Sequence, residues 1–341
     1  MIDLLVAGGG PAGLAAGIHA ALRGLEVVVL EPRDAPVDKA CGEGVMPGGV
    51  AALRALGVEV SGRPLRGIRY VEGGRSAEAA FRHGPGLGVR RTELHAALHR
   101  RARELGVTVV RERAGAVRQD AGSVTAGGRT ARWLLAADGL HSPVRRSMGL
   151  EVAAGARPAR YGLRRHYRVR PWTDFVEVHW SRHSEAYVTP VGDDMVGVAV
   201  LGPRGGAPGR HEDRMADFPA LAPLLDGPAV SPVRGAGPLR RGTRRKVAGR
   251  VLFIGDAAGY VDALTGEGIA LALATAGAAV RCVASGRPDA YEAAWSRLTR
   301  RHRLLTEGLL RAREHPRTAG LIVPAACRLP ALFRAAVHAL Q

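Results

Sequence analysis

The stretch that decides the fold is Asp3–Arg33, DLLVAGGGPAGLAAGIHAALRGLEVVVLEPR. Its apolar start predicts a buried β-strand at Ile2–Ala7, and the small and apolar residues of Leu14–Leu22 predict a helix. A second apolar run, Glu26–Leu30, predicts the next strand. A strand, a helix and a strand in such close succession are typical of a βαβ unit in a parallel sheet.

Three glycines follow the first predicted strand with the spacing G-x-G-x-x-G, namely Gly8, Gly10 and Gly13. The first permits a tight turn, the second lets the backbone approach a pyrophosphate, and the third lets helix and strand pack closely. Glu31 ends the second strand, where a carboxylate can accept a hydrogen bond from a ribose hydroxyl. Because a helix N-terminus attracts phosphates, the pattern predicts a dinucleotide-binding site.

The composition is that of a globular chain of 341 residues, 46% hydrophobic and 23% charged. This length favours two domains, or one large domain with an insertion. The three cysteines are too few and too scattered for a disulfide framework or a zinc site, so we expect a reducing cytoplasm and no metal. No apolar stretch of about 18 residues is free of charge, so no transmembrane helix is expected.

The net charge of +18 comes almost entirely from arginine, because Lys39 and Lys246 are the only lysines among 49 basic residues. Nucleic-acid binding would require a basic stripe with interleaved aromatic residues or a known module, and neither occurs. We therefore expect no nucleic-acid partner. Attraction of an anionic cofactor, or peripheral contact with an anionic membrane surface, explains the charge better.

Two further motifs identify the dinucleotide. The segment ARWLLAADGLHSPVRRSMGL contains a short apolar run followed by Asp138-Gly139. The segment GRVLFIGDAAG has the same pattern, an apolar run followed by Gly255-Asp256. With the first glycine motif, they resemble the three fingerprints of the FAD-dependent para-hydroxybenzoate-hydroxylase-like superfamily. That superfamily includes aromatic monooxygenases, geranylgeranyl reductases and flavin halogenases, and the resemblance covers about residues 1 to 300.

The resemblance implies FAD as cofactor and assigns residues to it. Asp256 would hydrogen-bond a ribityl hydroxyl, and the helix that begins near Gly268 would point its positive end at the flavin pyrimidine. Arg91 matches the arginine that opens a helix near the cofactor phosphates. The segment DKACGEGV resembles the CGxG loop of the geranylgeranyl-reductase branch, which passes beside the isoalloxazine; Cys41 could instead be a small buried residue. The predicted FAD-binding residues are Gly8, Gly10, Pro11, Ala12, Gly13, Glu31, Arg33, Cys41, Gly42, Arg91, Asp138, Gly139, Gly255, Asp256, Gly266, Glu267, Gly268 and Ile269.

The predicted fold class is α/β, with a Rossmann-like FAD-binding domain, an inserted antiparallel sheet and C-terminal helices, and the resemblance implies that the sheet covers the substrate. In the sheet region, Val176, Val178 and Trp180 alternate with Phe175, Glu177 and His179, which predicts a half-buried strand. Gly192-Asp193-Asp194 predicts a hairpin turn. The predicted division assigns the FAD-binding domain to residues 1–66, 90–153 and 240–286, the substrate sheet to 67–89 and 154–239, and the helices to 287–341.

The chain also resembles a group of short bacterial hydroxylases of this superfamily, which implies hydroxylation of a phenolic, resorcinol or polyketide-type aromatic, with NAD(P)H as a transient electron donor and dioxygen as co-substrate. The CGEG loop and LTGEGI lean instead toward a reductase of prenyl double bonds, and this alternative stays open. A non-enzymatic flavin-binding protein is the remaining class. No catalytic base is assignable, and the residues predicted to face the substrate pocket are Cys41, Tyr187, His166 and His179. We expect Glu267 to be structural or to gate solvent.

Overall fold

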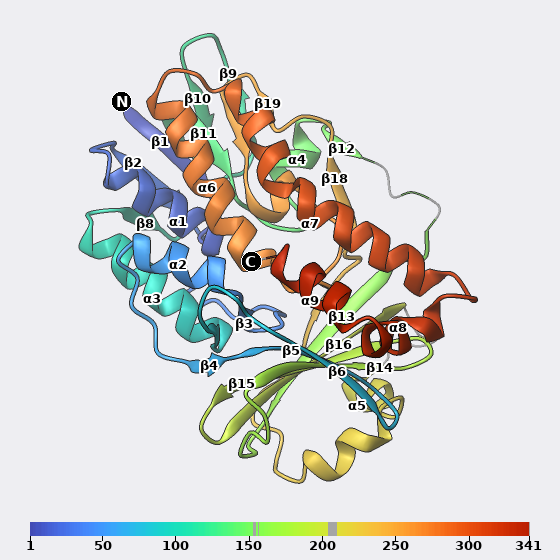
Figure 1. Cartoon of the computed structure of the whole chain (residues 1–341). Helices are drawn as coiled ribbons and strands as arrows, with labels where there is room; N and C mark the ends of the chain where they lie inside the picture. Colours follow the sequence, from blue (N-terminus) through green and yellow to red (C-terminus); the bar gives the residue numbers. More distant parts are fainter. Residues whose placement is uncertain (153–154, 156, 204–209, 341) are drawn as a thin grey trace.

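A computed structural model describes residues 1–152, 155, 157–203 and 210–340. Its first sheet has the strand order β19-β20-β11-β1-β2-β8, and β10 pairs with β11 while β9 pairs with β10 (Figure 1). The four neighbour pairs from β20 to β8 are parallel, as predicted for a Rossmann-like domain. The strands are β1 (Ile2–Ala7), β2 (Val27–Leu30), β8 (Thr108–Val110), β9 (Arg118–Gln119), β10 (Val124–Ala126), β11 (Arg129–Ala136), β19 (Val247–Ala248) and β20 (Val251–Phe253).

Helices α1 (Pro11–Ala21), α3 (Arg91–Glu104) and α6 (Gly268–Ala284) accompany this sheet. The α1 helix begins three residues before the predicted Leu14, because Pro11 at its first position has the φ that a helix needs and no N–H to satisfy. The α3 helix buries one apolar face, including Leu94 and Leu98. Together with the buried strands, these helices form the larger hydrophobic core.

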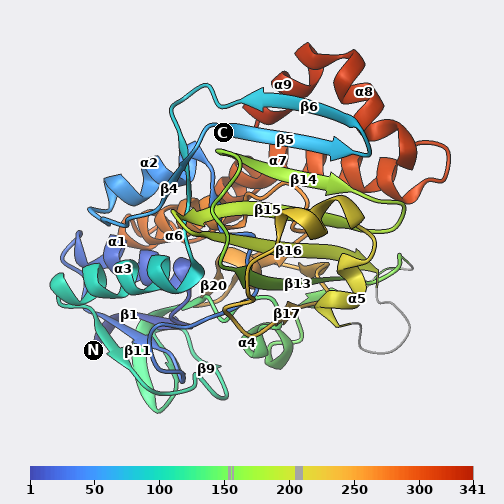
Figure 2. The same cartoon turned by 90° about the horizontal axis from the view of Figure 1, so that it is seen from below.

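The second sheet has seven strands in the order β17-β13-β16-β15-β14-β5-β6 (Figure 2). Its neighbours are antiparallel except β14 and β5, which run parallel and are joined by a long stretch of chain, as a parallel pair requires. The predicted hairpin turn at residues 192–194 connects β15 to β16. The strands are β5 (Gly67–Glu72), β6 (Arg75–Ala80), β13 (Arg160–Tyr167), β14 (Phe175–Trp180), β15 (Glu185–Gly192), β16 (Met195–Pro203) and β17 (Arg234–Ala236).

The prediction of a half-buried strand at residues 175–180 was wrong, because all six residues of β14 are buried. Val176, Val178 and Trp180 pack on one side into an apolar cluster that includes residues of the C-terminal helices. On the other side, Glu177 is held by an ion pair with Arg69. The polar face is therefore satisfied by internal partners, which alternation alone does not reveal.

Two small sheets and the remaining helices complete the fold. The sheets are β3 (Gly44–Val45), β7 (Gly86–Gly88) and β4 (Arg63–Leu65), and β12 (Glu151–Val152), β18 (Arg241–Thr243) and β21 (Gly259–Tyr260). The remaining helices are α2 (Pro47–Ala55), α4 (Pro143–Ser147), α5 (His211–Met215), η1 (Pro219–Leu224), η2 (Gly255–Ala258), α7 (Ala290–Glu314), η3 (Ala319–Leu321), α8 (Ile322–Arg328) and α9 (Pro330–His338). The α8 and α9 helices lie on β6 and beside α7 (Figure 1). The predicted domain boundaries stay a prediction.

Candidate functional site

The turn between β1 and α1 has the geometry of a phosphate-binding loop. Gly8 has φ +104°, a conformation that favours glycine. A Cβ on Gly13 would lie 1.8 Å from the carbonyl oxygen of Gly8, so helix and strand approach too closely for any side chain. A Cβ on Gly10 would meet nothing within 4 Å. The N-terminus of α1, with Pro11 and the buried Ala12, therefore opens onto free space.

Glu31 lies beside this turn. Its carboxylate accepts a hydrogen bond from the amide of Gly9 at 2.9 Å and from Nε of Arg33 at 2.7 Å. Burial raises the pKa of Glu31, but the Arg33 and Gly9 contacts together bring it below the ordinary value. The carboxylate is thus held ionised at the end of β2, where the sequence places a ribose acceptor.

Three cations converge on the same region. The charges of Arg33 and Arg91 act on Lys39, together with those of Asp256 and Glu31. Partial desolvation by the surrounding protein and the neighbouring guanidinium of Arg33 lower the pKa of Lys39. Lys39 is exposed, whereas Arg91 is buried, and Nη1 of Arg91 has no partner among the described residues. Such a cluster suits the two phosphates of a dinucleotide.

The sequence analysis did not assign Lys39 to the site. Its ammonium lies 3.3 Å from the position that a Cβ on Gly139 would occupy. The sequence offered only a weak signal, because Lys39 is one of two lysines in an arginine-rich chain and lies two residues before Cys41.

The two Asp motifs lie at the ends of their strands, as predicted. Asp138 accepts a hydrogen bond from the amide of Val144 at 2.9 Å through Oδ2, while its buried Oδ1 has no partner among the described residues. Asp256 opens the turn after β20, and Gly255 adopts φ +55°. Burial raises the pKa of Asp256, and the charges of Lys39 and Arg91 oppose that rise. Both carboxylates therefore have acceptor capacity left for a ligand.

The N-terminus of α6 begins where the sequence predicts it, with Glu267 as the residue before Gly268 and Ile269 in the first turn. Glu267 is 7% exposed, and its Oε1 has no partner among the described residues. Burial raises its pKa to about 8. The carboxyl group is therefore largely neutral at pH 7, so it adds little negative charge to the positive end of the helix.

The CGEG loop is tied down by Glu43, a functional candidate that the sequence analysis missed. Glu43 is buried and has φ 60°. Its carboxylate accepts from the amide of Arg91 at 2.8 Å and lies 2.6 Å from Nε2 of His166. The hydroxyl of Thr189 donates to the carbonyl of Gly42 at 2.8 Å. These contacts fix the loop between α3 and the second sheet.

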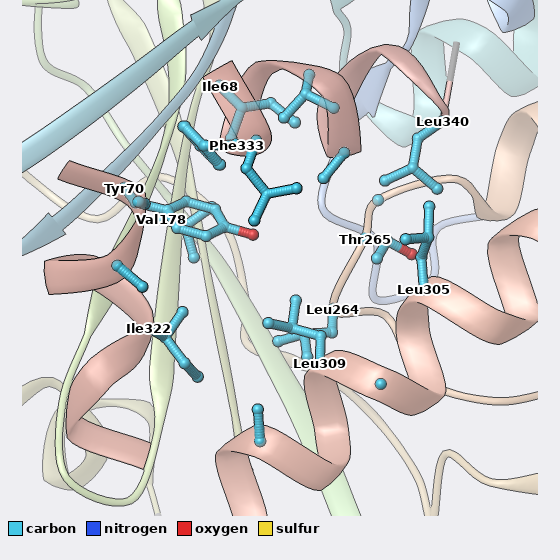
Figure 3. A pocket seen from close by; sticks show the side chains of 18 of the residues that line it. Ile68, Tyr70, Val178, Leu264, Thr265, Leu305, Leu309, Ile322, Phe333 and Leu340 are labelled. Atoms are coloured by element: carbon cyan, nitrogen blue, oxygen red, sulfur yellow. The ribbon is translucent and has the colours of Figure 1, made fainter. Parts of the chain in front are cut away.

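An apolar cavity of about 410 Å³ lies between the second sheet and the C-terminal helices (Figure 3). Strands β5, β14 and β15 form one wall, and α7, α8 and α9 form the other. Met46 and Gly266 also line it. Because Gly266 precedes the α6 N-terminus, the cavity reaches the position that the resemblance assigns to the flavin. The sequence analysis did not assign the C-terminal helices to the pocket.

The predicted pocket residues separate into two groups. Tyr187 lines the apolar cavity, and its hydroxyl donates to the carbonyl of Leu264 at 2.7 Å. His166 and His179 do not line it, because they pair with Glu43 and Glu177, respectively. Cys41 does not line it either; burial raises the pKa of its thiol. The two histidines therefore do not belong to the wall of this cavity, and their predicted place in the substrate pocket stays a prediction.

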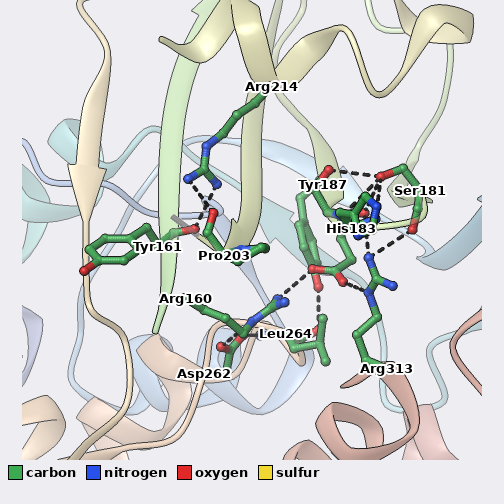
Figure 4. Close-up of polar contacts among 12 residues, drawn as sticks. Arg160, Tyr161, Ser181, His183, Tyr187, Pro203, Arg214, Asp262, Leu264 and Arg313 are labelled. Carbon is green, nitrogen blue, oxygen red and sulfur yellow. Dashed lines mark hydrogen bonds and ion pairs between the residues drawn. The ribbon is translucent and has the colours of Figure 1, made fainter. Parts of the chain in front are cut away.

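A buried ion-pair network holds β15 against the loop after β21 and against α7 (Figure 4). Glu185 pairs with Arg160 at 2.6 Å and also with Arg313. Arg160 extends the network to Asp262 at 3.0 Å. Because Tyr187 follows two residues after Glu185, the network fixes the wall of the apolar cavity.

A second, more polar cavity of about 770 Å³ lies on the other side of the loop that joins β20 to α6. Asp256 and Gly268 line it together with Arg240 and Arg241 and residues of α7. The segment from Gly255 to Gly268 thus separates a polar cavity from an apolar one.

Comparison with known proteins gives these sites a common context. The sequence model of the FAD binding domain family matches residues 1–286. The menaquinone reductase of Mycolicibacterium smegmatis is 31% identical over 345 residues, covering 88% of this chain and 80% of that protein. Digeranylgeranylglycerophospholipid reductase 1 of Methanothermobacter thermautotrophicus is 28% identical over 300 residues, covering 79% of this chain and 73% of that protein.

Solved structures support the fold. The flavin-dependent brominase Bmp2 superposes with a TM-score of 0.84 at 17% identity, covering 99% of this chain and 93% of that one. The halogenase PltM, solved in complex with phloroglucinol and FAD, gives a TM-score of 0.74 at 16% identity, covering 88% and 73%. At such identities the likeness shows the fold alone. With the family match, FAD is the cofactor.

Proposed function

Since the chain belongs to the FAD binding domain family and is an FAD-dependent oxidoreductase, we propose that it reduces a carbon–carbon double bond in an isoprenoid lipid. The relatives named as reductases of menaquinone and of a digeranylgeranyl phospholipid support this assignment. The main observation behind this proposal is the apolar cavity beside the α6 N-terminus, because an apolar lining is what a bound hydrocarbon chain requires.

The residues of the first site fit FAD. The open space at Gly10 and the converging cations Arg33, Lys39 and Arg91 suit the two phosphates. The unpartnered Oδ1 of Asp138 is a buried acceptor that lacks a donor within the protein. Bound and reduced, FAD would supply the hydride that the reaction needs.

The walls of the apolar cavity discriminate between the possible substrates. Its lining includes no carboxylate, histidine, lysine or arginine in the described part of the chain. A phenol would require a polar partner for its hydroxyl group, and among the described lining residues only Tyr70, Tyr187 and Thr265 carry side-chain hydroxyls, while the rest of the lining is apolar. Isoprenoid chains have no such group. The lining therefore supports the reductase rather than the aromatic hydroxylation that the sequence favoured.

Saturation of a double bond adds a hydride to one carbon and a proton to the other. Tyr70 carries an exchangeable proton in the wall of the cavity (Figure 3). Burial raises the pKa of Tyr70 above its ordinary value, so the hydroxyl is protonated but only weakly acidic. It would release its proton only as the substrate carbon accepts it, and the tyrosinate would then take a proton back from water. The Tyr187 hydroxyl already donates to Leu264. We assign Tyr70 the role of proton donor to the substrate carbon.

The test uses the holoprotein with reduced flavin under anaerobic conditions and a prenyl lipid as substrate. We expect the lipid to gain one pair of hydrogens per reduced double bond, as detected by mass spectrometry. Parallel aerobic reactions contain heavy dioxygen, NAD(P)H and candidate phenols. Labelled phenol products without any saturated lipid would contradict the reductase and support the hydroxylase. We also propose NAD(P)H as the electron donor, which the assay tests by following its oxidation. A cytoplasmic location is a further proposal, which cell fractionation tests.

A further inference from the structure

Exposed leucines surround the opening of the apolar cavity. Leu304 on α7 is 64% exposed, and Leu329 and Leu332 at α9 are 54% and 65% exposed, while all three also line the cavity. Large apolar side chains that are both exposed and continuous with an apolar cavity mark a contact surface for an apolar partner. We call these three residues the leucine rim.

The helices that carry the rim have the form of an interfacial anchor. No single helix among the described residues is long and apolar enough to span a membrane. The stretches 319–328 and 330–338 pass that composition test only as a pair, and they are bent by 102° where they meet. Such a short, bent pair suits a position in the plane of a lipid surface rather than across it.

Arginines accompany the leucine rim. Arg300 and Arg301 lie one helical turn before Leu304, and Arg328 and Arg334 flank the leucines of α9. All four are exposed, and none makes an ion pair within the described residues. Cations beside exposed leucines match a bilayer whose surface carries anionic headgroups.

We propose that the leucine rim and these four arginines dock the protein on an anionic lipid bilayer. The mouth of the cavity then faces the acyl region, so an isoprenoid lipid passes from the bilayer into the cavity without crossing water. The identity of the lipid substrate rests on the proposed function, whereas the docking rests on the exposed rim and its charges.

The test measures co-sedimentation of the holoprotein with vesicles, without any turnover. We expect binding to phosphatidylcholine vesicles that contain phosphatidylglycerol, weaker binding to phosphatidylcholine alone, and weaker binding as salt rises. Leu304→Gln combined with Leu332→Gln should lower the vesicle partition coefficient about tenfold or more. Leu22→Gln is the matched control, because Leu22 is 49% exposed at the end of α1. Flavin content reports folding of each variant.

Charge reversal of two arginines provides an independent test of the docking. Arg328→Glu combined with Arg334→Glu should abolish the preference for anionic vesicles, while reduction of a detergent-dispersed lipid continues because neither residue lines the cavity. Wild-type protein that fails to sediment, or rim variants that sediment like Leu22→Gln, would overturn the docking. Since sedimentation needs no reaction, absence of lipid reduction would refute the proposed function alone.

Discussion

Replacement of Glu267 by glutamine should make the stability of the flavin-free protein less dependent on pH. The folded protein raises the pKa of this buried carboxyl from 4.5 to about 8. At ~1.4 kcal/mol per pH unit, this rise amounts to roughly 5 kcal/mol. Because the folded state holds a proton that the unfolded state releases, the free energy of unfolding falls as pH rises from 4.5 and levels off above about 8.

The assay is urea unfolding of flavin-free wild type and Glu267→Gln across this range. As pH rises from about 5.5 to 8.5, the free energy of unfolding of wild type should fall by about 3 kcal/mol more than that of the variant, because an amide cannot ionise. The variant should be the more stable protein at the alkaline end. If the free energy of unfolding changes equally with pH in both proteins, Glu267 ionises freely. That result would refute the claim that burial raises its pKa.

The remaining predictions concern the cofactor site and the buried network. Asp256→Ala should weaken FAD binding about tenfold or more in a fluorescence titration, because a charge-assisted acceptor is worth ~1.5–3 kcal/mol; unchanged affinity would reduce Asp256 to a turn-forming residue. Gly10→Ala should leave the urea midpoint unchanged but lower FAD affinity, whereas Gly13→Ala should lower the free energy of unfolding by about 1–3 kcal/mol and with it the urea midpoint, since its Cβ would lie 1.8 Å from a backbone oxygen. Equal midpoints for these two variants would contradict the assigned geometry. Arg160→Met should cost about 3–5 kcal/mol in unfolding free energy, because Asp262 stays buried without its cation; a neutral result would show the network to be dispensable.

The fold was predictable because its signals are local. The glycines between β1 and α1, and the Asp138 and Asp256 motifs, each follow a short buried strand, and every strand-to-turn step can be identified within a few residues. Placement of the α6 N-terminus near Gly268 was predictable for the same reason. The exact start of α1 was missed because the helix-forming role of Pro11 outweighed the apolar periodicity.

The apolar cavity was not predictable, since its walls come from distant parts of the chain. Nothing in the sequence near Leu304 or Leu332 indicates that these residues meet β5 and β14. The pairing of Glu43 with His166 joins positions 123 residues apart, so no local sequence pattern indicates it. Lys39 was missed because a lone cation has no motif of its own.

The most direct test of the central claim is an anaerobic single-turnover reduction of a prenyl lipid by wild type and by Gly308→Phe. Gly308 lines the apolar cavity and is exposed, and a Cβ there would meet nothing within 4 Å. The helix therefore has room for the ring, and we expect the ring to narrow the opening of the cavity. We predict a saturated lipid with wild type and a loss of that product with the variant, at equal flavin content. Undiminished saturation by Gly308→Phe would contradict the assignment of this cavity to the substrate, and no saturation by wild type would contradict the reductase.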